Sequence, residues 1–484
     1  MKKLFTKLFS TALLACLTLV GFSVKAQTTS LADGNAAQVS SPKSSLAFAP
    51  AEVKPEAKPA AEVGTLARKP KKAAEDTSWK PQRRLWGYTF GDLYYDSHAD
   101  ADIVGATGVP EGGAGALSKR GPEGMYNGVP TYRNAFQFRR LYLGYDYEIT
   151  KKFKAEVLLA SEPNANTGAA SGTSIQNGDN LVDGKMAFWI KNFNLRVRDL
   201  WTGTDLVVGE LSTPGFALNE PGTNGPTSLS ETTWGYRSIE KTITDVHKNN
   251  SYDVGASLQG TFDPATKNYG YVLMVSDNST ASLLNASNPN TGFYKIVYGD
   301  LWGKFLNNHL YADFYVHTAK TGPASAALGA ESNTMYKLFA AYLSKPFNLG
   351  VEAYTQTFVN GVTNTTTKAV SDATVNGLSI WVRGAISSTW NYFAKWDNYN
   401  PFTDYDPTAS YSVNPNIAYG AYSPSAKENF YTAGLDYNPT KNVHFMPNFW
   451  LLNFKDQRAS STTGYVNPDH TLVLRMTFFY TFGK

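Results

Sequence analysis

The residues of this chain that could do chemistry are charged side chains alternating with apolar ones in strand-like segments. In residues 471–483, Arg475 shares one face with Thr477, while Leu474 and Met476 fall on the other. Because a strand turns successive side chains to opposite sides of its sheet, such a segment has one apolar and one polar face. In a membrane barrel the apolar face meets lipid and the polar face meets a water-filled lumen.

Motifs for covalent or metal chemistry are absent from the sequence. It holds no G-x-S-x-G, H-E-x-x-H, P-loop or paired zinc-ligand spacing, and its six histidines are scattered. Its one cysteine, Cys16, lies in an N-terminal apolar run. We therefore expect no enzyme activity, no metal site and no cofactor, and we expect the charged residues to act through electrostatics.

The amino end predicts a secreted protein. Three lysines precede an apolar run over residues 8–22, and a small-x-small pattern ends at Ala26, so residues 1–26 are predicted to be a signal peptide. Residues 27–84 are rich in Ala, Pro, Lys and Glu and cannot bury enough apolar area to fold. We expect a disordered periplasmic arm there, either a solvated spacer or a contact to the cell wall, followed by a β-barrel over residues 85–484.

The charge balance argues against nucleic-acid binding. The full chain has 44 Lys and Arg against 40 Asp and Glu, and the predicted signal peptide removes four lysines and no acid. The mature chain would be close to neutral, whereas a nucleic-acid-binding domain needs a clustered excess of basic residues.

From Leu85 onward the chain divides into segments of about ten residues, the length of a tilted membrane strand. Connections between them alternate between short and long, and such alternation predicts an all-β antiparallel barrel of about sixteen strands. An antiparallel sandwich in water would also alternate, but its connections are rarely this long. We expect short turns at 150–152, 200–204, 263–267, 303–308, 345–347, around 387 and at 439–442, and long loops at 97–133, 162–182, 214–250, 277–290, 319–333, 361–375, 401–428 and 455–469.

One segment supports a family resemblance. Residues 136–160 (FQFRRLYLGYDYEITKKFKAEVLLA) resemble the opening hairpin of the Bacteroidota-type porins related to the phosphate-selective porins O and P. The likeness is looser over residues 391–399, 443–454 and the closing strand. It implies a trimeric sixteen-stranded channel in the bacterial outer membrane, in contact with lipid and lipopolysaccharide. In such barrels the short turns, the N-terminal arm and the C-terminus lie on the periplasmic side.

Strand parity assigns the residues that would line a lumen, because an inward charge stays hydrated whereas a lipid-facing one is costly. On the strand that contains Lys191, a β-bulge is needed to turn all four cations inward. The predicted pore-lining residues are Arg140, Lys154, Glu156, Lys185, Lys191, Arg196, Arg198, Asp253, Lys295, Asp313, Glu352, Arg383, Lys395, Asp397 and Arg475. The same parity places Lys337, Asp146, Glu148 and Asp436 inside.

The loop over residues 214–250 is the third long loop, the one that folds inward in general porins. We expect it to narrow the channel, the alternative being an exposed flap. The residues that would form the constriction are Glu220, Glu231, Arg237, Glu240, Lys241 and Lys248.

Passive diffusion of small hydrophilic solutes or ions is the function that these features favour. An anion- or phosphate-selective channel would need a dense inward ladder of Arg and Lys, whereas the barrel region has more acidic than basic residues. A structural or ligand-binding outer-membrane protein, anchored by its arm, is the remaining alternative.

Overall fold

The structure is a computed structural model that describes a single β-barrel and the loops close to it. The described residues are 79–98, 132, 134–161, 188–215, 229–247, 251–277, 294–321, 331–344, 346–414, 424–462 and 470–483. The predicted signal peptide and nearly all of the predicted arm lie outside them.

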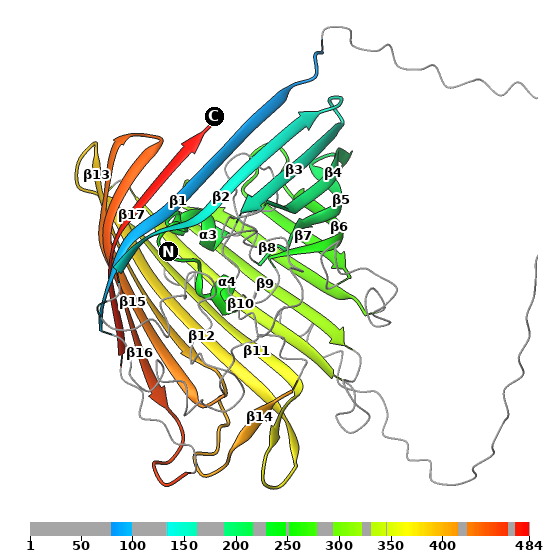
Figure 1. Ribbon diagram of the computed structural model, residues 1–484. Coiled ribbons are helices and arrows are strands. Elements are labelled where there is room, and N and C mark those ends of the chain that lie inside the picture. Colours follow the sequence, from blue (N-terminus) through cyan, green and yellow to red (C-terminus); the bar gives the residue numbers. More distant parts are fainter. Residues whose placement is uncertain are drawn as a thin grey trace, which may run out of the picture. The chain divides into compact units, whose positions relative to one another are not determined.

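Sixteen long strands and one very short strand make up the sheet (Figure 1). The short strand is β14 (Tyr411–Val413), which pairs with β11 outside the main strand order. The long strands are β1 (Arg83–His98), β2 (Asn134–Glu148), β3 (Phe153–Ser161), β4 (Trp189–Trp201), β5 (Thr204–Ser212), β6 (Tyr252–Thr261), β7 (Tyr269–Ser276), β8 (Ile296–Phe305), β9 (Leu310–Thr321), β10 (Glu331–Leu343), β11 (Asn348–Asn364), β12 (Val370–Ala385), β13 (Trp390–Asn400), β15 (Ala426–Thr440), β16 (Val443–Asp456) and β17 (His470–Phe482).

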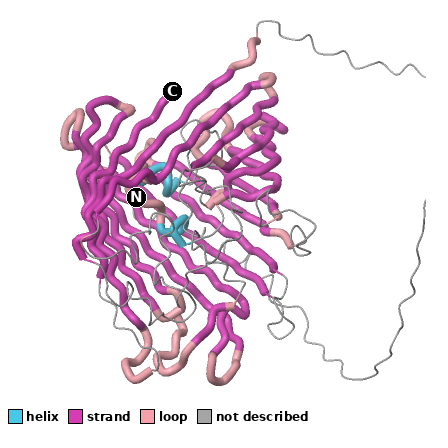
Figure 2. The backbone as a smooth tube through the Cα atoms, viewed as in Figure 1, coloured by secondary structure: helices cyan, strands magenta, loops and turns pink. Residues whose placement is uncertain are grey.

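The sheet is closed. Each long strand pairs antiparallel with its neighbours in sequence, and β1 pairs with β17 from Gly87 opposite Phe482 to His98 opposite Leu472. Figure 2 shows the strands running around the barrel in one continuous layer. The predicted sixteen-stranded antiparallel barrel is therefore confirmed. β1 begins at Arg83, slightly before the predicted boundary, because Arg83 and Arg84 pair with the end of β2.

The connections follow the predicted alternation with one exception. All seven predicted short turns fall between paired strands. The long loop predicted at 361–375 is wrong, because β11 continues to Asn364 and β12 begins at Val370. Val362 and Ala373 are buried in an apolar cluster there, and β14 adds a third strand to this extended hairpin.

The two faces of the sheet have opposite chemistry, and the outer one is apolar. In β17 the side chains of Leu474 and Met476 are 48% and 42% exposed, whereas Arg475 between them is 4% exposed. The same arrangement recurs around the barrel, with large apolar side chains exposed outside and charged ones buried inside. A soluble protein would bury its apolar face instead. Trp86 belongs to the inner face, where its indole nitrogen donates a hydrogen bond to Asp146.

Two short helices lie inside the barrel (Figure 1). They are α3 (Leu229–Trp234) and α4 (Ile243–His247), both from the connection between β5 and β6. We call residues 229–247 the inner segment. Every residue of α4 and all but one of α3 are buried. No helix among the described residues is long and apolar enough to cross a membrane.

Candidate pore lining and inner segment

Two β-bulges set which charges face inward. Leu158 and Leu159 of β3 lie opposite Asn192 and Ile190 of β4, so Lys191 is the extra residue on β4. The bulge predicted there is confirmed, and both Lys191 and Asn192 are buried. On β2 a second bulge makes Arg139 the extra residue opposite Phe90 and Gly91.

This second bulge turns both arginines of the Arg139–Arg140 pair into the barrel, whereas strict alternation predicts only Arg140. The Nε atom of Arg139 lies 2.6 Å from a carboxylate oxygen of Asp92, and the two side chains are 2% and 0% exposed. Asp92 also accepts a hydrogen bond from Thr477. Strict alternation misses Arg139, although the sequence carries a signal: the outward Phe136 and Phe138 are out of step with Leu141 and Leu143, as a bulge between them requires.

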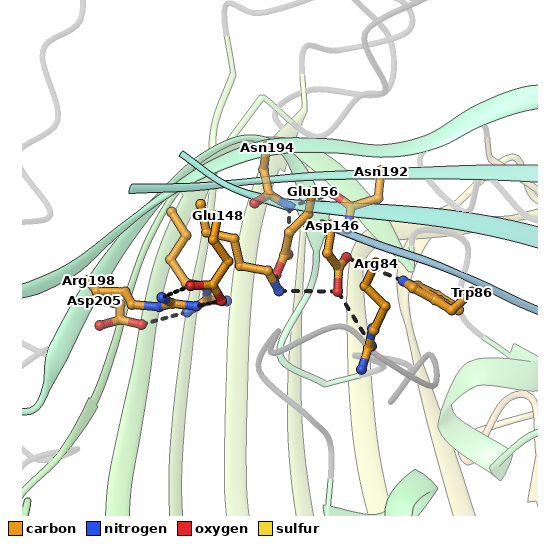
Figure 3. A network of polar contacts seen from close by, with 11 residues as sticks. Arg84, Trp86, Asp146, Glu148, Glu156, Asn192, Asn194, Arg198 and Asp205 are labelled. Atoms are coloured by element: carbon orange, nitrogen blue, oxygen red, sulfur yellow. Dashed lines mark hydrogen bonds and ion pairs between the residues drawn. The ribbon is translucent and has the colours of Figure 1, made fainter. Parts of the chain in front are cut away.

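A polar network joins the first strands of the wall (Figure 3). Asp146 lies 3.4 Å from both Arg84 and Lys154, and Lys154 pairs with Glu156 at 2.7 Å. Asn194 extends the network to Glu156 and Asn192. Because Asp146, Lys154 and Glu156 are buried with partners in reach, they hold the wall rigid as well as polar.

Two further ion pairs continue the network toward β5. Arg196 pairs with Asp205 at 3.0 Å, and Arg198 binds both carboxylate oxygens of Glu148 at 2.6 and 2.8 Å. Arg198 and Glu148 remain about one quarter exposed. Figure 3 shows these side chains on one side of the neighbouring strands.

The other predicted lining residues occupy different parts of the wall. Lys337 lies 3.7 Å from Asp313, and Lys395 lies 3.1 Å from Asp397. Two of the predicted residues are not on a described strand. Lys295 precedes β8, is 48% exposed and pairs with Asp277, so the parity argument does not apply to it; Lys185 lies outside the described residues. The remaining members, Arg140, Lys191, Asp253, Glu352, Arg383 and Arg475, are all on inward-facing strand positions.

The inner segment makes polar contacts with much of the wall. Its backbone carbonyls accept hydrogen bonds from three wall cations: Ser238 from Arg139, Ile239 from Arg475, and Lys241 from Lys395. These contacts come from β2, β17 and β13. The segment is therefore held by strands that are far apart in the sequence.

Further contacts fix its two helices. In α4, Thr244 donates to Glu352 of β11. In α3, the indole of Trp234 lies 5.9 Å from that of Trp381, and next to α3 Tyr236 lies 4.5 Å from Phe393 between ring centres. These aromatic contacts form a buried apolar cluster between the inner segment and the wall.

Three of the predicted constriction residues, Glu231, Arg237 and Lys241, form an ion cluster with Asp245 within the segment. Arg237 lies 2.9 Å from Asp245 and 3.7 Å from Glu231, and Lys241 lies 3.7 Å from Asp245. Burial raises the pKa of Glu231. Burial alone would also raise the pKa of Asp245. The nearby charges of Lys241 and Arg237 outweigh this effect and hold the pKa of that carboxyl below its usual range.

Glu240 is also buried in the segment. Glu220 and Lys248 lie outside the described residues.

Two cavities lie between the inner segment and the short-turn end of the wall. The larger, about 720 Å³, is lined by β4–β8 and the nearby turns and reaches Leu229 of α3; its cations are Arg196, Arg198, Lys267 and Lys304. The smaller, about 330 Å³, lies between residues 235–238 and strands β11–β17. Neither cavity shows in the alternation pattern, because both depend on where the inner segment lies.

Comparison with known proteins finds similar solved structures but no matching family. No protein-family model and no curated protein matches the sequence. Among solved structures, it is similar to the anion-selective porin from Comamonas acidovorans (12% identity, TM-score 0.47, covering 83% of this chain and 100% of that one). It is also similar to the outer membrane channel DcaP of Acinetobacter baumannii (10%, 0.49, 83% and 97%) and to OprB of Pseudomonas putida (8%, 0.47, 83% and 94%). At TM-scores below 0.5, these likenesses say nothing of what this chain transports, and the resemblance to the porins O and P stays a prediction.

Proposed function

We propose that this protein is an outer-membrane porin that lets small hydrophilic solutes or ions diffuse passively through its barrel. The observation that carries the proposal is the reversed chemistry of its two faces, apolar outside and charged inside. An apolar outer face is stable in lipid, and a sixteen-stranded barrel with a polar inner face leaves an aqueous channel unless a plug fills it.

Reconstitution into planar lipid bilayers tests this function. Folded protein should give discrete conductance steps, and reversal potentials in a salt gradient should report its ion preference. Correctly folded protein that inserts without conducting would favour a structural or ligand-binding role instead.

We further propose that the inner segment narrows the pore. Support comes from its polar contacts with β2, β11, β13 and β17 and from the two cavities that remain between it and the wall. The wall and segment carry both signs of charge in close pairs, so passage would depend on size and local field more than on net charge. This mixture supports a general pore over a phosphate-selective one.

A loop replacement tests the narrowing. Ser212 at the end of β5 lies opposite Tyr252 at the start of β6, so a short Gly-rich turn can replace residues 214–250 and keep the hairpin. We expect a higher single-channel conductance. The matched control replaces residues 278–294, whose flanking Ser276 and Ile296 are also paired, and should leave conductance unchanged. Equal conductance in both variants would refute the narrowing.

The orientation and assembly are proposals as well. Gly87 of β1 lies opposite Phe482 of β17, so the first and last strands meet at the short-turn end of the barrel. This supports a periplasmic N-terminal arm and C-terminus, with lipopolysaccharide around the opposite end. Protease added outside intact cells should spare both termini. The family resemblance supports a homotrimer, which cross-linking of folded protein would test. Contact of residues 27–84 with the cell wall is a separate proposal, which a binding assay with purified cell wall would test.

A further inference from the structure

The smaller cavity brings a cation, an acid and apolar side chains together. Residues 235–238 of the inner segment form one side, and the ends of β11, β12, β13, β15, β16 and β17 form the other. Two large apolar side chains, Met446 and Phe479, line it from inward positions on β16 and β17. Its 330 Å³ is at the lower end of the range for small-molecule sites.

Arg383 is the cation of this cavity. Its guanidinium lies 5.9 Å from the ring centre of Tyr236 and close to Gly235, whose φ is +69°. Within the described part of the chain, Arg383 makes no ion pair with an acid. Its two terminal nitrogens therefore keep the fork of donors that binds a carboxylate through two parallel hydrogen bonds.

The acid of the cavity is already satisfied. Asp436 accepts hydrogen bonds from Tyr236 at 3.2 Å, Asn391 at 3.4 Å and His444 at 2.9 Å, and its side chain is only 3% exposed. A cationic ligand would have to displace these donors. The cavity thus offers one available charged group, a cation, beside an apolar surface.

Access to the cavity comes from the short-turn end. Ala385 is exposed at the edge of the lining, Ser344 lies in the turn between β10 and β11, and Asn348 begins β11. His444 is 18% exposed, so solvent reaches this part of the wall.

We propose that this cavity binds a small carboxylate with a short apolar tail. The carboxylate pairs with the terminal nitrogens of Arg383, and the tail lies against Met446 and Phe479. An apolar surface favours such a ligand over inorganic phosphate, which has no apolar part to bury and needs more donors around it. The inference goes beyond the proposed function, because binding requires the cavity and not conduction.

Ligand-detected NMR on folded protein in detergent micelles tests the site, with butyrate as the probe and empty micelles as the blank. We expect saturable butyrate binding. Butanol and inorganic phosphate, each at a concentration equal to that of butyrate, should displace little of the bound butyrate. Arg383→Gln should weaken binding by about tenfold, the cost of one charge-assisted contact. The control Lys304→Gln, which removes a cation lining the other cavity, should bind butyrate as the unchanged protein does.

A second variant keeps the proposal testable if Arg383→Gln folds poorly. Ala385 shares the inward parity of Arg383, so Ala385→Phe fills the cavity and leaves the cation in place; it should also reduce butyrate binding. The proposal is overturned if butyrate shows no saturable binding, or if phosphate displaces butyrate as effectively as added butyrate does. It is also overturned if both Arg383→Gln and Ala385→Phe bind butyrate as the unchanged protein does. Protein that binds butyrate but gives no conductance steps would refute the porin function alone.

Discussion

At the scale of single residues, the charges inside the barrel differ in how much they stabilise it. Arg139 and Asp92 are almost completely buried, whereas Arg198 and Glu148 keep about a quarter of their side chains in solvent. Removing one partner of a buried pair leaves a charge that water cannot reach. Removing one partner of an exposed pair costs little free energy of unfolding, because water solvates the charge that remains.

The Arg139→Met variant tests this difference. It leaves Asp92 with Thr477 and with Arg475 at 3.8 Å, and it also removes the hydrogen bond to Ser238 of the inner segment. We expect a loss of about 3 kcal/mol in the free energy of unfolding. The matched Arg198→Met variant should lose at most about 1 kcal/mol. Urea unfolding of the reconstituted protein, followed by tryptophan fluorescence, compares the two, and equal losses would contradict the assignment.

Residue-level prediction from the sequence succeeds where alternation is strict and fails where the backbone departs from it. Arg475 could be assigned to the inner face because the residues around it alternate without interruption. Lys191 required a bulge, which its own strand signals by a change of step. Arg139 is missed when alternation is carried through β2 without a break, although Phe136 and Phe138 are out of step with Leu141 and Leu143.

At the scale of elements, the short turns and the inward course of the 214–250 loop were predictable, and the contacts that fix the inner segment were not. A short turn needs only a few polar residues between two alternating runs. The position of residues 229–247 instead depends on contacts with β2, β11, β13 and β17, which lie far away in sequence. The prediction of a loop at 361–375 was wrong for a similar reason. The Thr-rich end of this hairpin has the composition of a loop, and its extended form depends on pairing with β14, which lies further along the chain.

The ion cluster of the inner segment makes a prediction about pH. The pKa of Asp245 lies below that of an unfolded aspartate, so its stabilising effect is present above the unfolded pKa of about 3.9 and is lost as pH falls through the lower folded value. The pKa of Glu231 is raised, so its effect is present below the unfolded pKa and is lost as pH rises through the folded value. Acidification from pH 7 to pH 5 should therefore not release the segment.

Hydrogen–deuterium exchange of peptides from residues 229–247 measures this. After correction for intrinsic rates, protection at pH 5 should equal or exceed that at pH 7. Asp245→Asn, which breaks the pairs with Arg237 and Lys241, should lower the local stability by about 3 kcal/mol and speed exchange about a hundredfold. The control Asp263→Asn changes an exposed turn and should leave these peptides unaffected. Faster exchange of the unchanged protein at pH 5 would contradict the charge assignment.

At the scale of the whole molecule, barrel closure and the reversed faces depend on each other. Pairing of β1 with β17 removes the free edges of the sheet, so all strands meet their hydrogen-bonding requirement within the barrel. Only a closed sheet of this kind can turn its entire apolar face to lipid. The even strand number and the alternation, both visible in the sequence, are two consequences of that single requirement.

The outer face gives the last prediction. Leu474 lies near the middle of β17 and is 48% exposed on the apolar face, so it should contact hydrocarbon. Leu474→Arg should cost about 2–4 kcal/mol of folding free energy in phospholipid vesicles, since an arginine near the bilayer midplane is poorly solvated. The matched control Leu306→Arg makes the same exchange at a residue that is 61% exposed in the short turn between β8 and β9, where water is available. It should cost close to nothing, and equal costs at the two positions would mean that the apolar face of this barrel does not lie in lipid.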